Sequence, residues 1–305
     1  MKRVSAGTVF AFATFFGIPG AVFGQNSCEG VAAQPPQVED AQTYVYKSVG
    51  NTDLRLHIFT PKNSRPSDRR AAAVFFFGGG WTDGSVEQFV PQSKYLASRG
   101  MVAVVADYRV RCRHDSTPFE SVADAASAIR WVRLHARELG VDPARIAAGG
   151  GSAGGHVALS AGIFVNHEAA DATVSSKPNA LVLFNPVIDL TSKPIRDILS
   201  SFSTETIDRI GEISPLQHVH KGLPPTIILN GKADKIALYS IAKNYCNAAA
   251  RLGNECRLVG YKGAGHGFFN PEVQGGKWYR PTLLEADRFL TRLGYLASPT
   301  PSAIP

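Results

Sequence analysis

Short apolar runs alternate with helix-period segments along most of the chain. Six runs are apolar enough to be buried strands, and they lie at residues 72–77, 101–106, 145–148, 180–184, 226–230 and 256–261. Between them, apolar residues recur every three or four positions, as in residues 122–139, where the stripe stops at Gly140. This alternation predicts an α/β fold with a mostly parallel central sheet flanked by helices.

Two further features of the pattern lie outside this rhythm. Residues 43–49 and 54–60 alternate with a period of two on either side of a Gly-Asn turn, which predicts an antiparallel pair of strands before the parallel sheet. Residues 191–213 are polar and separate two of the predicted strands. We expect them to form short helices in a small cap segment.

The first 24 residues have the pattern of a secretory signal peptide. Lys2 and Arg3 precede the apolar run at residues 9–18, and Gly24 is a small residue at a suitable cleavage point. This run is shorter than the ~20 residues that span a membrane, and Pro19 interrupts it, so we expect no stable membrane anchor. The pattern predicts a secreted or periplasmic protein.

Length and charge narrow the class further. A chain of 305 residues with 44% hydrophobic content can bury one large core, so we expect residues 25–297 to form a single domain and residues 298–305 a disordered tail. The formal net charge of +7 comes from scattered basic residues and indicates no nucleic-acid partner. The one dense basic run, residues 109–114, is interpreted as a solvated loop, with contact to an acidic sugar as the alternative.

The four cysteines are Cys28, Cys112, Cys246 and Cys256. An even number of cysteines in an exported chain permits two disulfides. Cys246 falls on a helix-period run and Cys256 begins the next strand-like run, so a short turn can bring their Cα atoms within the roughly 4.4–6.8 Å that a disulfide needs. We predict this bridge. The cysteines and histidines show no metal-ligand spacing, and no metal site is expected.

The segment GGSAG at residues 150–154 is the strongest chemical signal in the chain. It follows the apolar run at residues 145–148 and precedes a helix-like stretch. This context is typical of a nucleophile elbow, where glycines leave room for a sharp strand-to-helix turn that projects a serine. The three fixed positions alone recur by chance in about one chain of this size in ten. With its neighbours, the segment makes Ser152 the candidate nucleophile.

A second glycine-rich segment lies upstream. Residues 73–77 are β-branched and aromatic, and they run into three glycines, so exposed backbone N–H groups follow a buried strand. We expect an oxyanion hole built from the N–H of Gly79 or Gly80 and that of Ala153, the residue after the candidate nucleophile. Trp81 comes next, and we expect its indole beside the substrate pocket. The alternative is a core tryptophan that braces the loop.

A catalytic base and acid can be assigned from their order in the chain. In this kind of site the serine is followed by an acid and then by a histidine. His266 lies in a glycine-rich loop after a strand-like run, and it is the candidate base. Asp234 is preferred as the acid, with Asp189 as a competitor, because each follows a predicted strand. His156 is expected to point into the packing of its own helix.

Together, these residues resemble an α/β-hydrolase of the hormone-sensitive-lipase-like kind, and within it the bacterial carbohydrate acetyl or feruloyl esterases. The resemblance covers most of the chain between residues 44 and 293. The matching segments are residues 78–81, 107–109, 141–146, 150–155, 213–216, Asp234 and residues 265–268. One departure is Phe77, which stands where the family usually has a histidine before the glycines.

The resemblance implies a serine carboxylic-ester hydrolase that acts through an acyl-enzyme on short-acyl esters, acetyl esters in particular, or on carbohydrate-linked esters. Ser152 would attack the ester, His266 would carry the proton and Asp234 would orient His266, with no cofactor. The alternatives are a serine peptidase resembling the catalytic domain of prolyl oligopeptidases and a catalytically silent binding protein. The natural ester and the oligomeric state stay open at this point.

Overall fold

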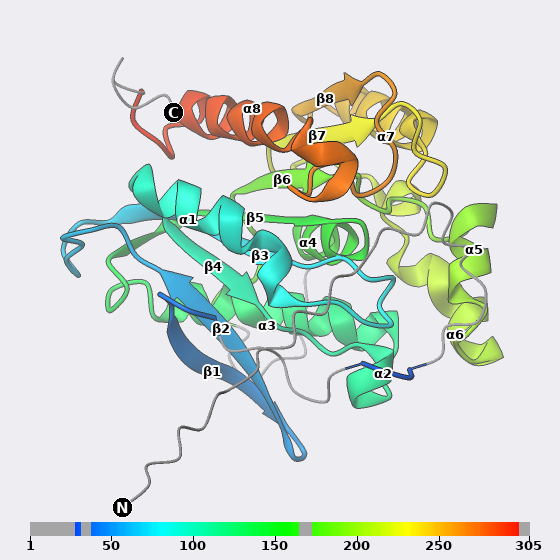
Figure 1. Ribbon diagram of the computed structural model, residues 1–305, viewed down its shortest axis with the longest axis horizontal. Helices are drawn as coiled ribbons and strands as arrows, with labels where there is room; N and C mark the ends of the chain where they lie inside the picture. Colours follow the sequence, from blue (N-terminus) through cyan, green and yellow to red (C-terminus); the bar gives the residue numbers. More distant parts are fainter. Residues whose placement is uncertain (1–27, 32–37, 165–172, 299–305) are drawn as a thin grey trace, which may run out of the picture.

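A computed structural model describes residues 28–31, 38–164 and 173–298. These residues contain one eight-stranded sheet in the order β1-β2-β4-β3-β5-β6-β7-β8, flanked by helices (Figure 1). The predicted α/β class with a mostly parallel sheet is therefore confirmed. The predicted signal peptide, residues 1–24, and nearly all of the predicted tail, residues 298–305, lie outside the described residues.

The strands follow the apolar pattern closely. The six parallel strands are β3 (Arg70–Phe76), β4 (Val102–Ala106), β5 (Val141–Gly151), β6 (Ala180–Phe184), β7 (Thr226–Gly231) and β8 (Cys256–Tyr261). Every residue of β4 and β6 is buried, because helices cover both faces of a parallel sheet. β1 (Gln42–Val49) and β2 (Thr52–Phe59) pair antiparallel, as predicted.

Helices connect the strands and flank the sheet. They are α1 (Val90–Ser98), α2 (Arg111–His114), α3 (Pro118–Leu134), α4 (Ala153–Ile163), α5 (Lys193–Leu199), α6 (Thr204–Arg209), α7 (Tyr239–Arg251) and α8 (Tyr279–Arg292). A capping box of Thr117 and Glu120 begins α3. The helix ends five residues before the end of the predicted stripe, but Ala136 and Leu139 remain buried in the turn that follows. The apolar periodicity therefore extends beyond the end of the helix.

The segment between β6 and β7 forms the predicted cap. It contains α5, α6 and the short 3-10 helix η2 (Ile210–Ile213), which Figure 1 shows on the side of the molecule away from β1 and β2. Ile195, Leu199 and Ile210 are buried and fix this segment to the rest of the fold. None of the helices in the described ranges is long and apolar enough to cross a membrane.

Two disulfides are present. Cys246 and Cys256 are bonded, with their Cα atoms 5.1 Å apart, as predicted. Cys28 and Cys112 are also bonded, with a Cα separation of 5.0 Å. Because Cys112 lies on α2, this second bridge ties the N-terminal part of the described chain to the region behind the glycine loop.

The interpretation of the dense basic run, residues 109–114, as a solvated loop was wrong. Arg109 pairs with the buried carboxylate of Asp124 at 2.8 Å, and Arg113 pairs with the buried Asp107 at 3.0 Å. Residues 111–114 form α2. Two of the charges are thus used to neutralise buried carboxylates, and the sequence pattern does not reveal that Asp107 and Asp124 are buried.

Candidate active site

Ser152 lies at the sharp turn between β5 and α4. Its φ is 54° and its ψ is −119°, a conformation that costs energy for any residue with a side chain and is typical of functional turns. A Cβ on Gly150 would approach the carbonyl carbon of Gly154 to 2.5 Å, and one on Gly154 would lie 2.1 Å from the Phe76 oxygen. Only glycine fits these two positions, so the turn has the geometry of a nucleophile elbow.

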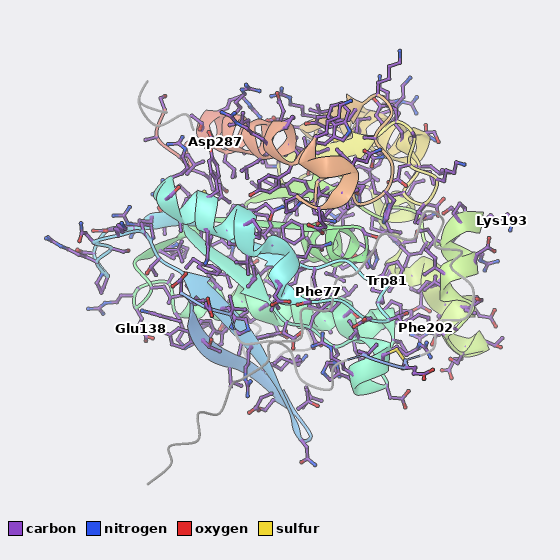
Figure 2. The ribbon with its side chains drawn as sticks, in the orientation of Figure 1. Phe77, Trp81, Glu138, Lys193, Phe202 and Asp287 are labelled. Atoms are coloured by element: carbon purple, nitrogen blue, oxygen red, sulfur yellow. A yellow bond between two sulfur atoms is a disulfide. The ribbon has the colours of Figure 1, made fainter. Side chains whose placement is uncertain are left out.

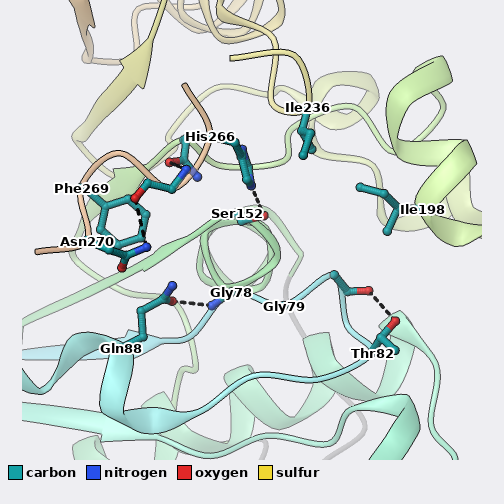
Figure 3. A pocket seen from close by; sticks show the side chains of 13 residues that line it. Gly78, Gly79, Thr82, Gln88, Ser152, Ile198, Ile236, His266, Phe269 and Asn270 are labelled. Atoms are coloured by element: carbon teal, nitrogen blue, oxygen red, sulfur yellow. Dashed lines mark hydrogen bonds between the residues drawn. The ribbon is translucent and has the colours of Figure 1, made fainter. Parts of the chain in front are cut away.

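Three side chains from distant parts of the chain form a hydrogen-bonded line. Nε2 of His266 lies 2.9 Å from Oγ of Ser152 (Figure 3). Nδ1 of His266 lies 2.9 Å from Oδ2 of Asp234. The carboxylate therefore holds the tautomer in which Nδ1 carries the proton and Nε2 accepts one from the serine hydroxyl. Oδ1 of Asp234 accepts the N–H groups of Ile236 and Ala237, which fixes the carboxylate in place.

Asp189, the competing acid, has a different set of partners. Its Oδ1 accepts hydrogen bonds from the N–H of Thr191 at 2.9 Å and from Nε2 of Gln217 at 3.1 Å. These bonds stabilise the turn that leads into the cap segment. The structure thus brings Asp234, and not Asp189, to His266.

The glycine loop after β3 lies against the elbow. Gly79 and Gly80 both line the same cavity as Ser152 and adopt positive φ angles of 137° and 62°. A Cβ on Gly79 would lie 2.0 Å from the carbonyl oxygen of Asp83, so the backbone follows this path only with glycine. Ala153 is the first residue of α4, and its N–H has no partner within the helix. The expected oxyanion donors are thus gathered around the serine.

Other side chains replace the histidine that is missing at Phe77. Oε1 of Gln88 accepts the N–H of Gly78 at 2.7 Å, a bond visible in Figure 3. The hydroxyl of Tyr108 donates to the carbonyl of Phe77 at 2.7 Å, and the two rings stack with centroids 4.2 Å apart. The loop is therefore braced by one amide and one phenol. Sequence reasoning missed Gln88, because a glutamine ten residues downstream carries no recognisable pattern.

The prediction that the Trp81 indole stands beside the pocket was wrong. Trp81 is 0% exposed and does not line the cavity, and Figure 2 shows it in the interior while Lys193 of α5 points outward. Its Nε1–H donates to Nδ1 of His156 at 3.2 Å, and Nε2 of His156 donates to the carbonyl of Ile213 at 2.8 Å. Burial lowers the pKa of His156 to about 4, so the ring is neutral. Trp81 therefore braces the loop from behind.

The cavity over Ser152 has a volume of about 250 Å³. Its lining combines backbone, amide and apolar groups, and His266 is the only titratable side chain among them. The lining residues are Gly78, Gly79, Gly80, Thr82, Gln88, Ser152, Asn185, Ile198, Ile236, His266, Gly267, Phe269 and Asn270. This volume lies slightly below the ~300–1,000 Å³ of typical small-molecule pockets, so a small ligand fits it best.

Comparisons with known proteins agree with this site. Residues 56–247, more than half of the chain, match the family model BD-FAE. The chain is 46% identical to the thermophilic esterase Est2 of Thermogutta terrifontis, with a TM-score of 0.78, covering 86% of this chain and 96% of that one. It is 29% identical to esterase LipC of Mycobacterium tuberculosis over 68% of this chain and 55% of LipC.

A third relative is the acetylxylan esterase of Xylanibacter ruminicola, which is 26% identical over 77% of this chain and 48% of the relative. The chain thus spans about half the length of the curated relatives it matches. The family model matches more than half of the chain, and the likeness to Est2 extends along nearly all of that chain. The chain belongs to the BD-FAE family of hormone-sensitive-lipase-like α/β-hydrolase esterases.

Proposed function

We propose that this chain is a serine carboxylic-ester hydrolase that acts through an acyl-enzyme. The observation that carries the proposal is the hydrogen-bonded line from Asp234 through His266 to Ser152, opening on a cavity of about 250 Å³. A hydroxyl becomes nucleophilic when an adjacent base takes its proton, and an oriented histidine is the usual base.

The reaction proceeds in two halves. Oγ of Ser152 attacks the ester carbonyl carbon while Nε2 of His266 takes the hydroxyl proton, and Asp234 stabilises the imidazolium that forms. The carbonyl oxygen becomes an oxyanion that accepts hydrogen bonds from the N–H groups near Gly79, Gly80 and Ala153. The alcohol then leaves with the proton from His266. A water molecule repeats the sequence on the acyl-enzyme and releases the carboxylic acid.

Short acyl groups, acetyl in particular, are the proposed substrates, either as simple or as carbohydrate-linked esters. The small cavity supports this choice. Two structures of Thermogutta terrifontis Est2 have propionate and butyrate bound, and one relative is named an acetylxylan esterase. These bound acids and this substrate name belong to the related proteins. Together they support the proposal that this chain also acts on short acyl groups.

Export is part of the proposal. The pattern of the first 24 residues is that of a secretory signal, and two disulfides stabilise the described part of the chain. We infer that residues 25–297 act as one secreted or periplasmic catalytic domain after cleavage near Gly24.

A chain-length series tests the substrate proposal. We expect kcat/KM for p-nitrophenyl esters to be highest between acetate and butyrate and to fall steadily toward palmitate, because the cavity cannot bury a long chain. Acetate release from acetylated xylan, measured in parallel, tests the carbohydrate-linked arm. Peak activity at about ten or more acyl carbons, with no acetate from xylan, would contradict the short-acyl proposal and favour a lipase.

A further inference from the structure

One end of the catalytic cavity is lined by amide side chains. Gln88 comes from the short helix before α1, Asn185 follows β6, and Asn270 lies in the loop after the catalytic histidine. Figure 3 shows Gln88 and Asn270 to one side of Ser152 and the apolar Ile198 of the cap segment to the other. The amide side chains are therefore gathered at one end of the cavity, beside the ring of Phe269 and away from Ile198.

Each amide is held in one orientation by a backbone group. Oε1 of Gln88 accepts the N–H of Gly78 at 2.7 Å, and Oδ1 of Asn185 accepts the N–H of Gly267 at 3.2 Å. Nδ2 of Asn270 donates to the carbonyl of Gly267 at 3.0 Å. A backbone N–H must meet an oxygen, and a carbonyl must meet an N–H. The second polar atom of each amide is therefore identified. In Gln88 and Asn185 it is an NH₂ donor, and in Asn270 it is an oxygen acceptor.

Two of these atoms have no hydrogen-bond partner among the described residues. Asn185 is 0% exposed and Asn270 is 8% exposed, and neither Nδ2 of Asn185 nor Oδ1 of Asn270 is paired. Buried polar groups are nearly always paired in native proteins, so an unpaired one calls for an explanation such as strain, a catalytic role or an ordered water. Both residues are among those that line the cavity above Ser152, so a substrate bound at this end of the cavity lies against them.

The chemistry of the free ends selects one kind of substituent. A carboxylate only accepts hydrogen bonds and an ammonium only donates them, whereas a hydroxyl does both. The described residues that line the cavity include no Asp, Glu, Lys or Arg that would compensate a charge. An alkyl group would leave the amide ends unpaired, which disfavours its binding. A neutral hydroxyl matches two donors and one acceptor.

We infer that Gln88, Asn185 and Asn270 form a subsite that binds a hydroxyl group of the ester substrate, next to the scissile bond. The inference rests on the proposed esterase function and specifies its substrates as esters of polyols, sugars or hydroxy acids. It also gives Gln88 two roles, since the same amide braces Gly78 and donates to substrate.

Matched ester pairs test the subsite. On the alcohol side, 2-hydroxyethyl acetate is compared with propyl acetate, and on the acid side, ethyl 3-hydroxypropionate is compared with ethyl butyrate. Within each pair a hydroxyl replaces a methyl group of similar size. Acid release is followed in a pH-stat. We expect the hydroxyl member of at least one pair to have the higher kcat/KM, by about tenfold, because the methyl member leaves buried amide ends unpaired.

Variants separate recognition from bracing. Gln88→Met and Asn270→Leu remove the amide while keeping a side chain of similar size. Both also remove a backbone hydrogen bond, and that loss lowers the rate for the two members of a pair equally. Loss of recognition lowers the hydroxyl member alone, so we expect the hydroxyl-to-methyl ratio to fall to one or below. Ile198→Ala, at the opposite end of the cavity, is the matched control and should leave this ratio unchanged.

The outcomes are distinct. The inference is overturned if wild-type protein prefers the methyl member of both pairs, or if the variants lower both members equally and leave the ratio intact. Labelling of Ser152 by a fluorophosphonate in each variant confirms a folded site. Wild-type protein that hydrolyses none of the four esters would contradict the proposed esterase function itself. Turnover with methyl preference contradicts only the hydroxyl subsite.

Discussion

Two histidines lie close to the nucleophile elbow, and their surroundings differ. His266 sits in a glycine-rich loop with its side chain 23% exposed, and it joins Ser152 to a buried carboxylate. His156 lies on α4 and is 0% exposed, and it joins Trp81 to the cap segment at Ile213. Both rings use both nitrogens in hydrogen bonds. Only the first lies where a proton can pass to and from a substrate.

The two histidines have different roles because their hydrogen-bond partners and their burial differ. Asp234 accepts a hydrogen bond from Nδ1 of His266 and so lies where it can stabilise the imidazolium that forms during ester cleavage. Within the described residues no carboxylate pairs with His156, and burial lowers the pKa of His156 to about 4. This ring therefore stays neutral and links the oxyanion loop to the cap. His266 therefore carries the proton during catalysis, whereas His156 holds the oxyanion loop in position.

The largest expected effect follows from removing the histidine that carries the proton. His266→Ala should lower kcat for p-nitrophenyl acetate by about 10⁴- to 10⁶-fold, because the serine loses its base. The free energy of unfolding, measured with urea, should change little, since the loop is part-exposed. Residual activity within about tenfold of wild type would show that another group activates Ser152.

Replacing Asp234 tests whether this residue is the catalytic acid. Asp234→Asn should cut kcat by about 10⁴-fold, as in serine proteases, because the asparagine no longer holds the required tautomer. Asp189→Asn is the matched control, since Asp189 contacts Thr191 and Gln217 instead of the histidine. Steady-state kinetics with one ester compares the two. If Asp189→Asn proved the more damaging, the catalytic acid would have to be reassigned.

His156→Phe should affect stability more than chemistry. The change leaves Trp81 and Ile213 without their buried partners, which we expect to cost about 1–3 kcal/mol in the free energy of unfolding. Catalysis should fall by less than about 100-fold, through misplacement of the oxyanion loop. Urea denaturation and steady-state kinetics measure the two effects. A loss of activity as large as that of His266→Ala would erase the distinction between the two histidines.

The remaining effect is a change of stability with pH. The folded-state pKa of His156 lies at about 4, below its usual value of about 6.5, so the unfolded chain binds more protons between these values. Its stabilising contribution is complete above about pH 6.5 and is lost as pH falls toward 4, by up to about 3 kcal/mol.

His156→Gln isolates this contribution, because the amide can also accept from Trp81 and donate to Ile213 but does not titrate. Urea denaturation at pH 7 and at pH 4.5 should show a smaller loss of stability in the variant than in wild type. An equal loss in both proteins would mean that His156 is not a buried neutral group.

The parts of the site that the sequence revealed are those whose signal is local. The elbow around Ser152 and the loop around His266 each combine glycines with a reactive residue within a few positions. Gln88 was missed because its bond to Gly78 depends on the path of the chain between β3 and α1.

Trp81 was misplaced for a related reason. Its φ of 59° turns the side chain inward, and its partner His156 comes from α4, so neither fact is visible in the residues around it. The basic run at residues 109–114 was misread because its neighbour Asp107 and the more distant Asp124 are both buried, and a carboxylate's burial depends on the tertiary fold. The fold class and the strand positions were predicted correctly. A strand buried on both faces of the sheet is a continuous apolar run, and such a run is visible in the sequence.

The most direct test of the central claim is the site of covalent labelling. Purified protein is treated with a fluorophosphonate, digested and mapped by mass spectrometry, alongside Ser152→Ala. The account predicts one adduct, on Ser152, together with loss of esterase activity in wild type and neither adduct nor activity in Ser152→Ala. An adduct on a different serine, or undiminished ester turnover by Ser152→Ala, would contradict it.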